Sequence, residues 1–179
     1  KLTEKKEDAY KLYFENFPKH SRMPAVLFSF GLQKLAAEDY TGAMDYFKKI
    51  QTTYTNSTPY FDSINRIATC YEKLGDVTNE VKVLEGYIQE LEKAGTSVDA
   101  IRGKYRLAIA LRKMGPKSMG AALNRFGELD KQLSDPKHPY QKTPEEKETS
   151  DRILEGSKFF KALCYASLTQ PEDKLASYK

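Results

Sequence analysis

Apolar side chains recur at helical spacing along most of the chain, in stripes separated by short turn signals. Between Pro24 and Tyr87 the order of striped helix, tight turn and striped helix occurs twice, with EDYTG and LGDVT as the turns. A small residue, Gly31 or Ala68, lies midway along the first helix of each copy. Two helices approach to about 8–10 Å only where one carries little side chain at the crossing. The pattern therefore predicts a repeat protein made of helix pairs.

Extension of this pattern divides the chain into segments that belong to one helical repeat domain over residues 1–179. Small residues mark the successive first helices, at Gly31, Ala68, Ala108 and Ala162. The predicted segments are 3–17 as the second helix of a partial repeat, 24–57, 58–95 and 96–134 as repeats, and 143–179 as a long helix followed by a truncated last repeat. Of these, 58–95 is expected to be the best-formed pair.

Helix ends are indicated by capping residues and by glycine and proline. Candidate N-caps are Thr3, Thr41, Thr58, Asp76, Thr96 or Ser97, and Thr143, and Gly75 is expected to end its helix in a left-handed conformation. Pro171 is expected to start a helix that the chain end truncates. The segments GPKSMG and SDPKHPYQKTPEE are interpreted as a long turn and as a mobile loop.

Inward-facing stripes follow from the same periodicity. Candidate packing residues are Ala43, Phe47 and Ile50; Ile64, Ile67, Ala68 and Tyr71; Val81, Leu84, Tyr87, Ile88 and Leu91; Ile101, Tyr105, Ala108 and Leu111; Ala122, Phe126 and Leu129; and Ile153, Phe160, Ala162, Leu163 and Tyr165. Cys70 and Cys164 occupy similar strings, IATCYEKL and KALCYASL, so each is expected to be buried beside a small alanine rather than joined in a disulfide.

Composition adds a moderate positive charge to this picture. The chain carries a net charge of +4 with 30% charged residues, and its basic and acidic residues alternate at helical spacing. Solvated helix faces are favoured over a dedicated polyanion site. No apolar run approaches the roughly 18 residues of a membrane span. The first residue is Lys rather than Met, so the chain is interpreted as a trimmed or processed fragment that has lost flanking segments.

Motifs for catalysis or metal binding are not found. The two histidines, His20 and His138, both lie in proline-bearing linkers, and Glu145 and Glu146 occupy a first helical turn, where carboxylates favour the helix dipole. A glycine-rich phosphate loop, CxxC and HExxH do not occur. The sequence therefore predicts no enzyme, no catalytic or metal residues and no cofactor.

The strings FGLQKLAAEDYTGAMDYFKKI and IATCYEKLGDVTNEVKVL resemble the tetratricopeptide repeat (TPR) family in their order of large, small and aromatic residues around a turn. One departure is Glu80, which stands where the family usually has alanine. The resemblance implies an all-α fold, a right-handed superhelical stack of antiparallel helix pairs in the form of a TPR-like solenoid. The linker style is similar to bacterial envelope members, such as those of outer-membrane β-barrel assembly and the Tol-Pal system. It implies a periplasmic or envelope-associated location, with the cytoplasm as the alternative.

The resemblance also implies a concave binding surface, because first helices line that side of TPR stacks. The residues it places there are Phe28, Leu32, Leu35, Asn65, Arg66, Thr69, Lys73, Arg102, Tyr105, Arg106, Ile109, Arg112 and Lys113. Lys73 and Arg112 are expected to point into solvent. Two alternatives stay open: Phe28 and Leu32 pack under the preceding helix, and the basic residues pair with neighbours such as Glu72.

The function expected from these features is that of a protein–protein interaction scaffold, which binds a peptide segment or partner domain in a bacterial cell-envelope assembly. The alternative is nucleic-acid binding through a basic concave surface that includes Arg66, Arg102 and Arg112. The sequence indicates neither the identity of the partner nor the oligomeric state.

Overall fold

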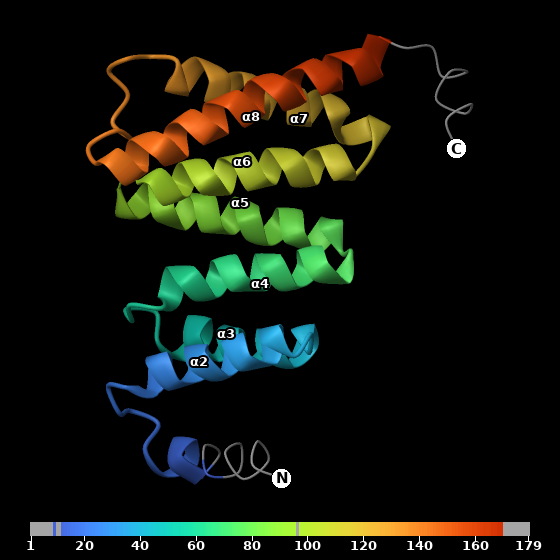
Figure 1. The fold of residues 1–179 in the computed structure, drawn as a ribbon. Helices are drawn as coiled ribbons and strands as arrows, with labels where there is room; N and C mark the ends of the chain where they lie inside the picture. Colours follow the sequence, from blue (N-terminus) through green and yellow to red (C-terminus); the bar gives the residue numbers. More distant parts are fainter. Residues whose placement is uncertain (1–8, 10–11, 96, 170–179) are drawn as a thin grey trace. The chain divides into compact units, whose positions relative to one another are not determined.

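The computed structural model of the chain describes residue 9 and residues 12–95 and 97–169 (Figure 1). These residues form helices joined by turns, and no strand occurs among them. Residues 12–16 are helical, and the helices that follow are α2 (Met23–Ala36), α3 (Tyr40–Thr53), α4 (Tyr60–Leu74), α5 (Val77–Ala94), α6 (Val98–Lys113), α7 (Pro116–Leu133) and α8 (Pro144–Thr169). The all-α prediction is confirmed for this part of the chain. The ends expected at Thr3, Thr96 and Pro171 lie outside the described residues.

The chain forms two compact units, Lys1–Cys70 and Tyr71–Lys179. The boundary falls within α4, so the first three turns of this helix belong to one unit and its end to the other. Each unit is described by itself below. The single domain, its repeat boundaries and the pairing of α4 with α5 therefore stay predictions.

In the N-terminal unit α2 packs on α3 at a crossing that requires glycine. A Cβ atom added to Gly31 would lie 2.5 Å from Cε1 of Phe47, whose side chain is fully buried. Ala43 and Ile50 are buried on the same helix as Phe47, as the stripe predicted. The expectation that a small residue sits at the helix crossing is confirmed for this pair.

The caps of the early helices confirm one prediction and correct another. Asp76 caps α5, because its Oδ1 accepts a hydrogen bond from the Asn79 amide at 3.1 Å. The cap of α3 is Asp39 rather than Thr41, with Asp39 Oδ1 accepting from the Gly42 amide at 3.0 Å. This bond and the Lys34 ammonium lower the pKa of Asp39. Thr41 already lies in the first turn of the helix, where its hydroxyl cannot serve as the N-cap.

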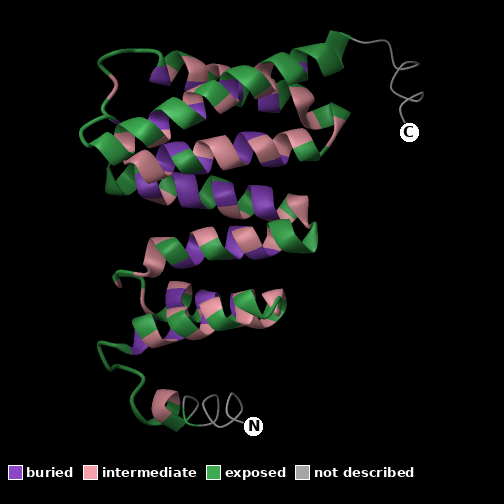
Figure 2. Ribbon diagram, in the orientation of Figure 1, coloured by how far each residue is buried: buried purple, intermediate pink, exposed green. Residues whose placement is uncertain are grey.

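In the C-terminal unit each helix from α5 to α8 packs on the next one, and α8 also contacts α6 (Figure 1). The buried positions follow the predicted stripes of α5 and α7 (Figure 2). In α6 Ile101 and Ala108 are buried as predicted, but Tyr105 and Leu111 are only half-buried. The core comprises one cluster around Ile101, Leu129, Leu133, Tyr140 and Ile153, and another around Ala108, Ala122, Phe126 and Cys164. A Cβ atom added to Gly103 would lie 3.1 Å from Cγ1 of Ile88, so α5 and α6 also approach at a small residue.

Two connecting segments of this unit differ from expectation. The string GPKSMG is not a long turn, because Gly115 takes a left-handed φ of 99° and Pro116 then starts α7 at once. The loop after α7 was expected to be mobile, but Tyr140 anchors it in the core. Its backbone oxygen accepts a hydrogen bond from Ser150 Oγ at 2.7 Å, and its hydroxyl accepts one from Gln132 Nε2 at 3.3 Å.

Helix α8 has 26 residues and begins as predicted, but its inward face differs from the expected one. Thr143 and Glu146 form a capping box, in which each side chain accepts from the other residue's amide at 3.2 Å. Ala162 is exposed, whereas Ser150 and Ser157 are buried small residues of this helix. Cys164 is buried as expected, as is Cys70, and both are free thiols. The fourth small-residue marker was therefore wrong.

Candidate binding surface

The predicted concave residues are divided between the two units. Six lie in the N-terminal unit, namely Phe28, Leu32, Leu35, Asn65, Arg66 and Thr69. Seven lie in the C-terminal unit, namely Lys73, Arg102, Tyr105, Arg106, Ile109, Arg112 and Lys113. The structure therefore describes two separate sets rather than one continuous surface.

In the N-terminal unit the apolar members are half-buried. Phe28 packs against the cluster of Met23, Leu27 and Ile50, and its ring centroid lies 5.6 Å from that of Phe47. Phe28 thus packs against α2 and α3, and the alternative in which Phe28 and Leu32 pack under the preceding helix stays a prediction. Arg66 on α4 is exposed.

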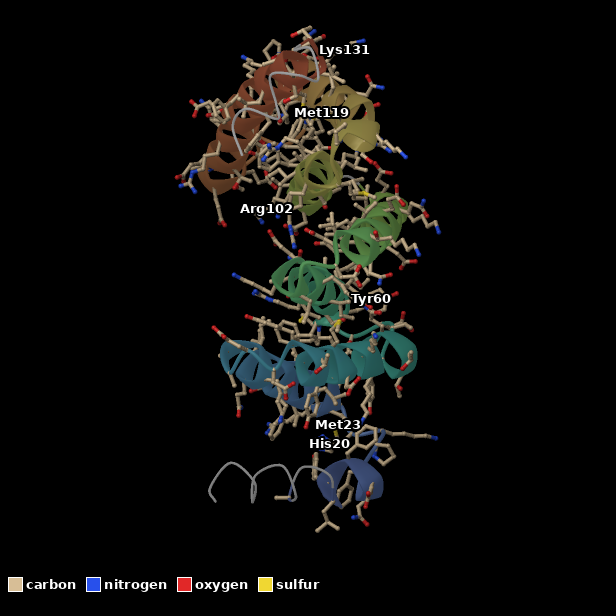
Figure 3. The ribbon with its side chains drawn as sticks, turned by 90° about the vertical axis from the view of Figure 1, so that its right-hand side faces the viewer. His20, Met23, Tyr60, Arg102, Met119 and Lys131 are labelled. Atoms are coloured by element: carbon tan, nitrogen blue, oxygen red, sulfur yellow. The ribbon has the colours of Figure 1, made fainter. Side chains whose placement is uncertain are left out.

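In the C-terminal unit α8 covers part of the α6 face that was expected to line a groove. Tyr105 packs against both Phe126 and Phe160, with ring centroids 6.1 and 6.3 Å away. The Arg112 guanidinium lies 4.9 Å from the centre of the Phe160 ring, a cation–π geometry. Arg112 Nε is buried without a hydrogen-bond partner. The expectation that Arg112 points into solvent is therefore wrong, because α8 crosses this end of α6; side chains fill the space between the helices in Figure 3.

The remaining basic residues of α6 are held by acidic partners. Glu72, at the end of α4, forms ion pairs with Lys113 at 2.8 Å and with Arg106 at 3.4 Å. The hydrogen bond from Lys113 contributes most to lowering the pKa of Glu72. Arg102 pairs with Asp99 at 2.7 Å and also donates to Thr149 Oγ1 on α8 at 3.1 Å. These contacts bear out the alternative in which Arg102, Arg106 and Lys113 pair with neighbours.

A buried carboxylate lies beside this ion-pair cluster. Glu80 on α5 is only 2% exposed, and its Oε2 has no hydrogen-bond partner. Burial, followed by the nearby Glu72 carboxylate, raises the pKa of Glu80. Glu80 is the position at which the sequence departs from the TPR-like pattern, and burial of an unpaired carboxylate oxygen is unfavourable in general.

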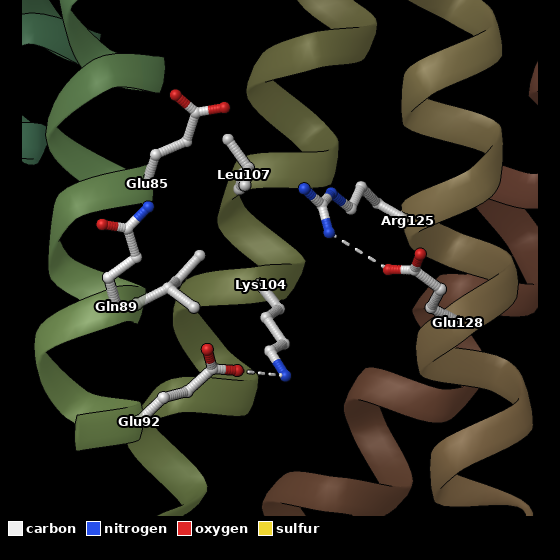
Figure 4. A pocket seen from close by; sticks show the side chains of 8 residues that line it. Glu85, Gln89, Glu92, Lys104, Leu107, Arg125 and Glu128 are labelled. Carbon is white, nitrogen blue, oxygen red and sulfur yellow. Dashed lines mark hydrogen bonds and ion pairs between the residues drawn. The ribbon is translucent and has the colours of Figure 1, made fainter. Parts of the chain in front are cut away.

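A charged groove, which the sequence did not suggest, runs across α5, α6 and α7 (Figure 4). It has a volume of about 400 Å³ and is lined by Glu85, Ile88, Gln89 and Glu92 of α5, Lys104 and Leu107 of α6, and Arg125 and Glu128 of α7. Ile88 and Leu107 are nearly buried and close its floor. The i, i+4, i+7 spacing of Glu85, Gln89 and Glu92 is the one signal in the sequence that places three of these side chains on one face.

Two ion pairs organise the walls of the charged groove. Lys104 Nζ lies 2.7 Å from Glu92 Oε1, and this pair links α6 to α5. Arg125 Nη1 lies 3.2 Å from Glu128 Oε2, one turn further along α7. Figure 4 shows Arg125 directed toward the centre of the groove, with Glu85 on the opposite wall. Among the described residues, Glu85 forms no ion pair with another lining residue.

The described residues offer little for nucleophilic or metal chemistry. Burial raises the pKa of the Cys70 thiol to about 11 and also raises that of Cys164, so both stay protonated at neutral pH. No group of three or more His, Cys, Asp or Glu side chains that could hold a metal occurs in the described ranges. Over the same ranges no helix is both long and apolar enough to cross a membrane.

Comparison of the chain with models of known families, with curated proteins and with solved structures finds no match. The site therefore has to be interpreted from its own geometry.

Proposed function

We propose that this chain is a non-catalytic protein–protein interaction scaffold of TPR-like repeats, which binds a peptide segment or a partner domain. Support for the helical-repeat part comes from consecutive helices that meet at small residues, Gly31 against Phe47 and Gly103 against Ile88. Helical repeats stack in this way because each unit buries its apolar face on the next one. The right-handed superhelix and the repeat boundaries given above are part of this proposal.

The observation that carries the binding role is the charged groove on α5, α6 and α7. It is concave and combines the carboxylate of Glu85 with the guanidinium of Arg125 on facing walls. Arg125 is held by one bond to Glu128, so a peptide carboxylate can share it, while Glu85 offers an acceptor for a peptide Lys or Arg. Its floor exposes little apolar area, so recognition is expected to be mainly electrostatic, modest in affinity and sensitive to salt.

A peptide-display selection on the intact chain tests this proposal. Selected peptides are expected to carry both basic and acidic residues, and calorimetry gives their affinities. Glu85→Lys is expected to weaken binding at least about tenfold, which corresponds to about 1.4 kcal/mol. Asp151→Lys, the same change of charge on an exposed part of α8 outside the groove, is the control and should leave binding unchanged. If no peptide binds, or if both variants behave alike, the proposal fails.

The envelope location is the second part of the proposal and rests on the resemblance of the linkers alone. Fractionation of the source cells, with detection of the native protein, tests it separately. Recovery in the periplasmic or membrane fraction is expected. Recovery in the cytoplasm would contradict the location and leave the binding role standing.

Nucleic-acid binding, the alternative function, gains no support from the basic side chains of α6 that suggested it, whereas Arg66 on α4 is exposed. Arg102, Arg106 and Lys113 each have an acidic partner, and Arg112 lies against an aromatic ring. Phosphate-driven binding is strongest at low salt, so band-shift assays at about 50 mM salt give the most sensitive test. No retardation of duplex or single-stranded probes is expected.

A further inference from the structure

The solvent-facing side of α8 changes character midway along the helix. Its first half exposes charged side chains, Glu148, Asp151, Arg152 and Glu155. Its second half exposes a stripe of apolar side chains, Phe159, Ala162, Leu163 and Ala166, here named the α8 stripe. Phe159 is 60% exposed and Leu163 is 39% exposed. The spacing of i, i+3, i+4 and i+7 places these four residues on one face of the helix.

The α8 stripe is not part of the core of its unit. The opposite face of the helix carries Ile153, Phe160 and Cys164, which pack in the two apolar clusters with residues of α6 and α7. Large exposed apolar side chains that line up on one face are typical of an interaction surface. No charged residue occurs between Lys161 and Thr169, so the last two turns of the helix expose no charge to an apolar partner.

We propose that the α8 stripe is a dimerisation surface, on which the same helix of a second copy of this chain lies antiparallel. The sequence of the stripe alternates large and small residues about its midpoint. A two-fold axis between Ala162 and Leu163 places Phe159 opposite Ala166 of the second copy, and Leu163 opposite Ala162 of the second copy. Each large side chain thus meets a small one, as an isologous interface requires. In a parallel arrangement the two copies of Phe159 would face each other, and each alanine would face the same alanine of the second copy.

The distribution of charge also favours the antiparallel arrangement. With this axis the two helices overlap over residues 156–169, a length of about 21 Å at 1.5 Å per residue. The charged first half of α8 lies outside the overlap. The basic residues within it are Lys158 and Lys161, and Lys161 is already paired with Asp130 at 2.5 Å. Antiparallel helices keep the two copies of Lys158 at opposite ends of the overlap, whereas parallel helices would bring them together.

The size of the surface sets the expected strength of the dimer. One helix pair of this length buries less than the roughly 1,200 Å² at which stable interfaces begin. The dimer is therefore expected to be weak and to form at high micromolar concentration. It does not involve the charged groove, so it is independent of the proposed peptide binding.

Sedimentation equilibrium of the intact chain, at about 10 µM to 1 mM, tests the dimer. Reversible association to a dimer is expected. Leu163→Glu should lower the association constant at least about tenfold, since it puts a charge at the axis. The control Asp151→Lys lies outside the overlap and should leave the constant unchanged. A chain that stays monomeric throughout this range, or association that survives Leu163→Glu, overturns the proposal.

A size swap tests the antiparallel register. Ala166→Phe alone places a phenylalanine opposite Phe159 of the second copy and should weaken the dimer. The double variant Phe159→Ala with Ala166→Phe again places a large residue opposite a small one, so it should regain association. A double variant no better than the single one overturns this register.

A thiol probe tests whether another part of the chain occupies the stripe. In Leu163→Cys the new thiol should react with a thiol reagent in the dilute monomer, while the native Cys70 and Cys164 are buried. An unreactive thiol there would mean that other residues of the chain cover the stripe, and would overturn the proposal.

Discussion

Replacement of Gly31 by alanine tests the helix crossing on which the repeat interpretation depends. The added Cβ would lie 2.5 Å from Cε1 and 2.7 Å from Cζ of Phe47. Favourable carbon contacts lie at about 3.5–4.0 Å, so a shift of roughly 1 Å is needed. The Phe47 side chain is fully buried and stands beside the ring of Phe28, with ring centroids 5.6 Å apart, so it has little room to move.

The magnitude follows from two opposing effects. Overpacking a core costs about 1–3 kcal/mol. Alanine gains about 1 kcal/mol over glycine inside a helix, which offsets part of that cost. The net expectation is a loss of about 0–2 kcal/mol in the free energy of unfolding. Gly86 in α5 is a matched control, because a Cβ there meets no atom within 4 Å. Gly86→Ala should therefore stabilise its unit by about 0.5–1 kcal/mol.

Urea unfolding followed by far-UV circular dichroism measures both changes. Hydrogen exchange assigns each change to its unit, which is necessary because Gly31 and Gly86 lie in different units. A double variant, Gly31→Ala with Phe47→Leu, should show favourable coupling of at least about 0.5 kcal/mol, since the smaller side chain makes room for the new methyl group. If Gly31→Ala stabilises the chain as much as Gly86→Ala does, the reasoning about the crossing is refuted.

Three further predictions concern the C-terminal unit and the turns beside it. Ala108→Phe should destabilise the chain by about 1–3 kcal/mol in thermal melts, whereas Phe at the exposed Lys73 should change stability by less than about 0.5 kcal/mol. The pKa of Glu80 in the folded chain is raised above its ordinary 4.5, so the contribution of Glu80 to stability falls as pH rises through this raised pKa. Glu80→Gln should therefore be more stabilising at pH 7 than at pH 4 in urea titrations. Thr143→Ala should cost about 1 kcal/mol through the lost capping box. Thr58→Ala should be near neutral by the same assay, because Thr58, a candidate N-cap in the sequence, lies in an exposed turn and forms no capping hydrogen bond within the described ranges.

Local patterns in the sequence were enough to predict much of the fold. Helix stripes and the caps at Asp76 and Thr143 depend on residues within one or two turns of each other, so they can be found in a single sequence. The glycine at position 31 was also predictable, because its small size is itself the signal for a close approach.

The errors arose where packing between distant helices decides which face is covered. KALCYASL and IATCYEKL look alike, but Ala162 is exposed while Ala68 is buried, because Ile153 and Phe160 fix the rotation of α8 on α6 and α7. The same crossing places Arg112 over Phe160 instead of in solvent. The charged groove was missed since it needs three helices side by side, and no local pattern in α7 indicates which of its side chains face α5.

Chemical-shift mapping of a selected peptide on the intact chain tests the central claim of peptide binding most directly. Amide and side-chain shifts are expected to change chiefly at the groove residues Glu85, Gln89, Lys104, Arg125 and Glu128 and to fade with added salt. Shift changes confined to the N-terminal unit or to α8, or none at saturating peptide, would contradict it.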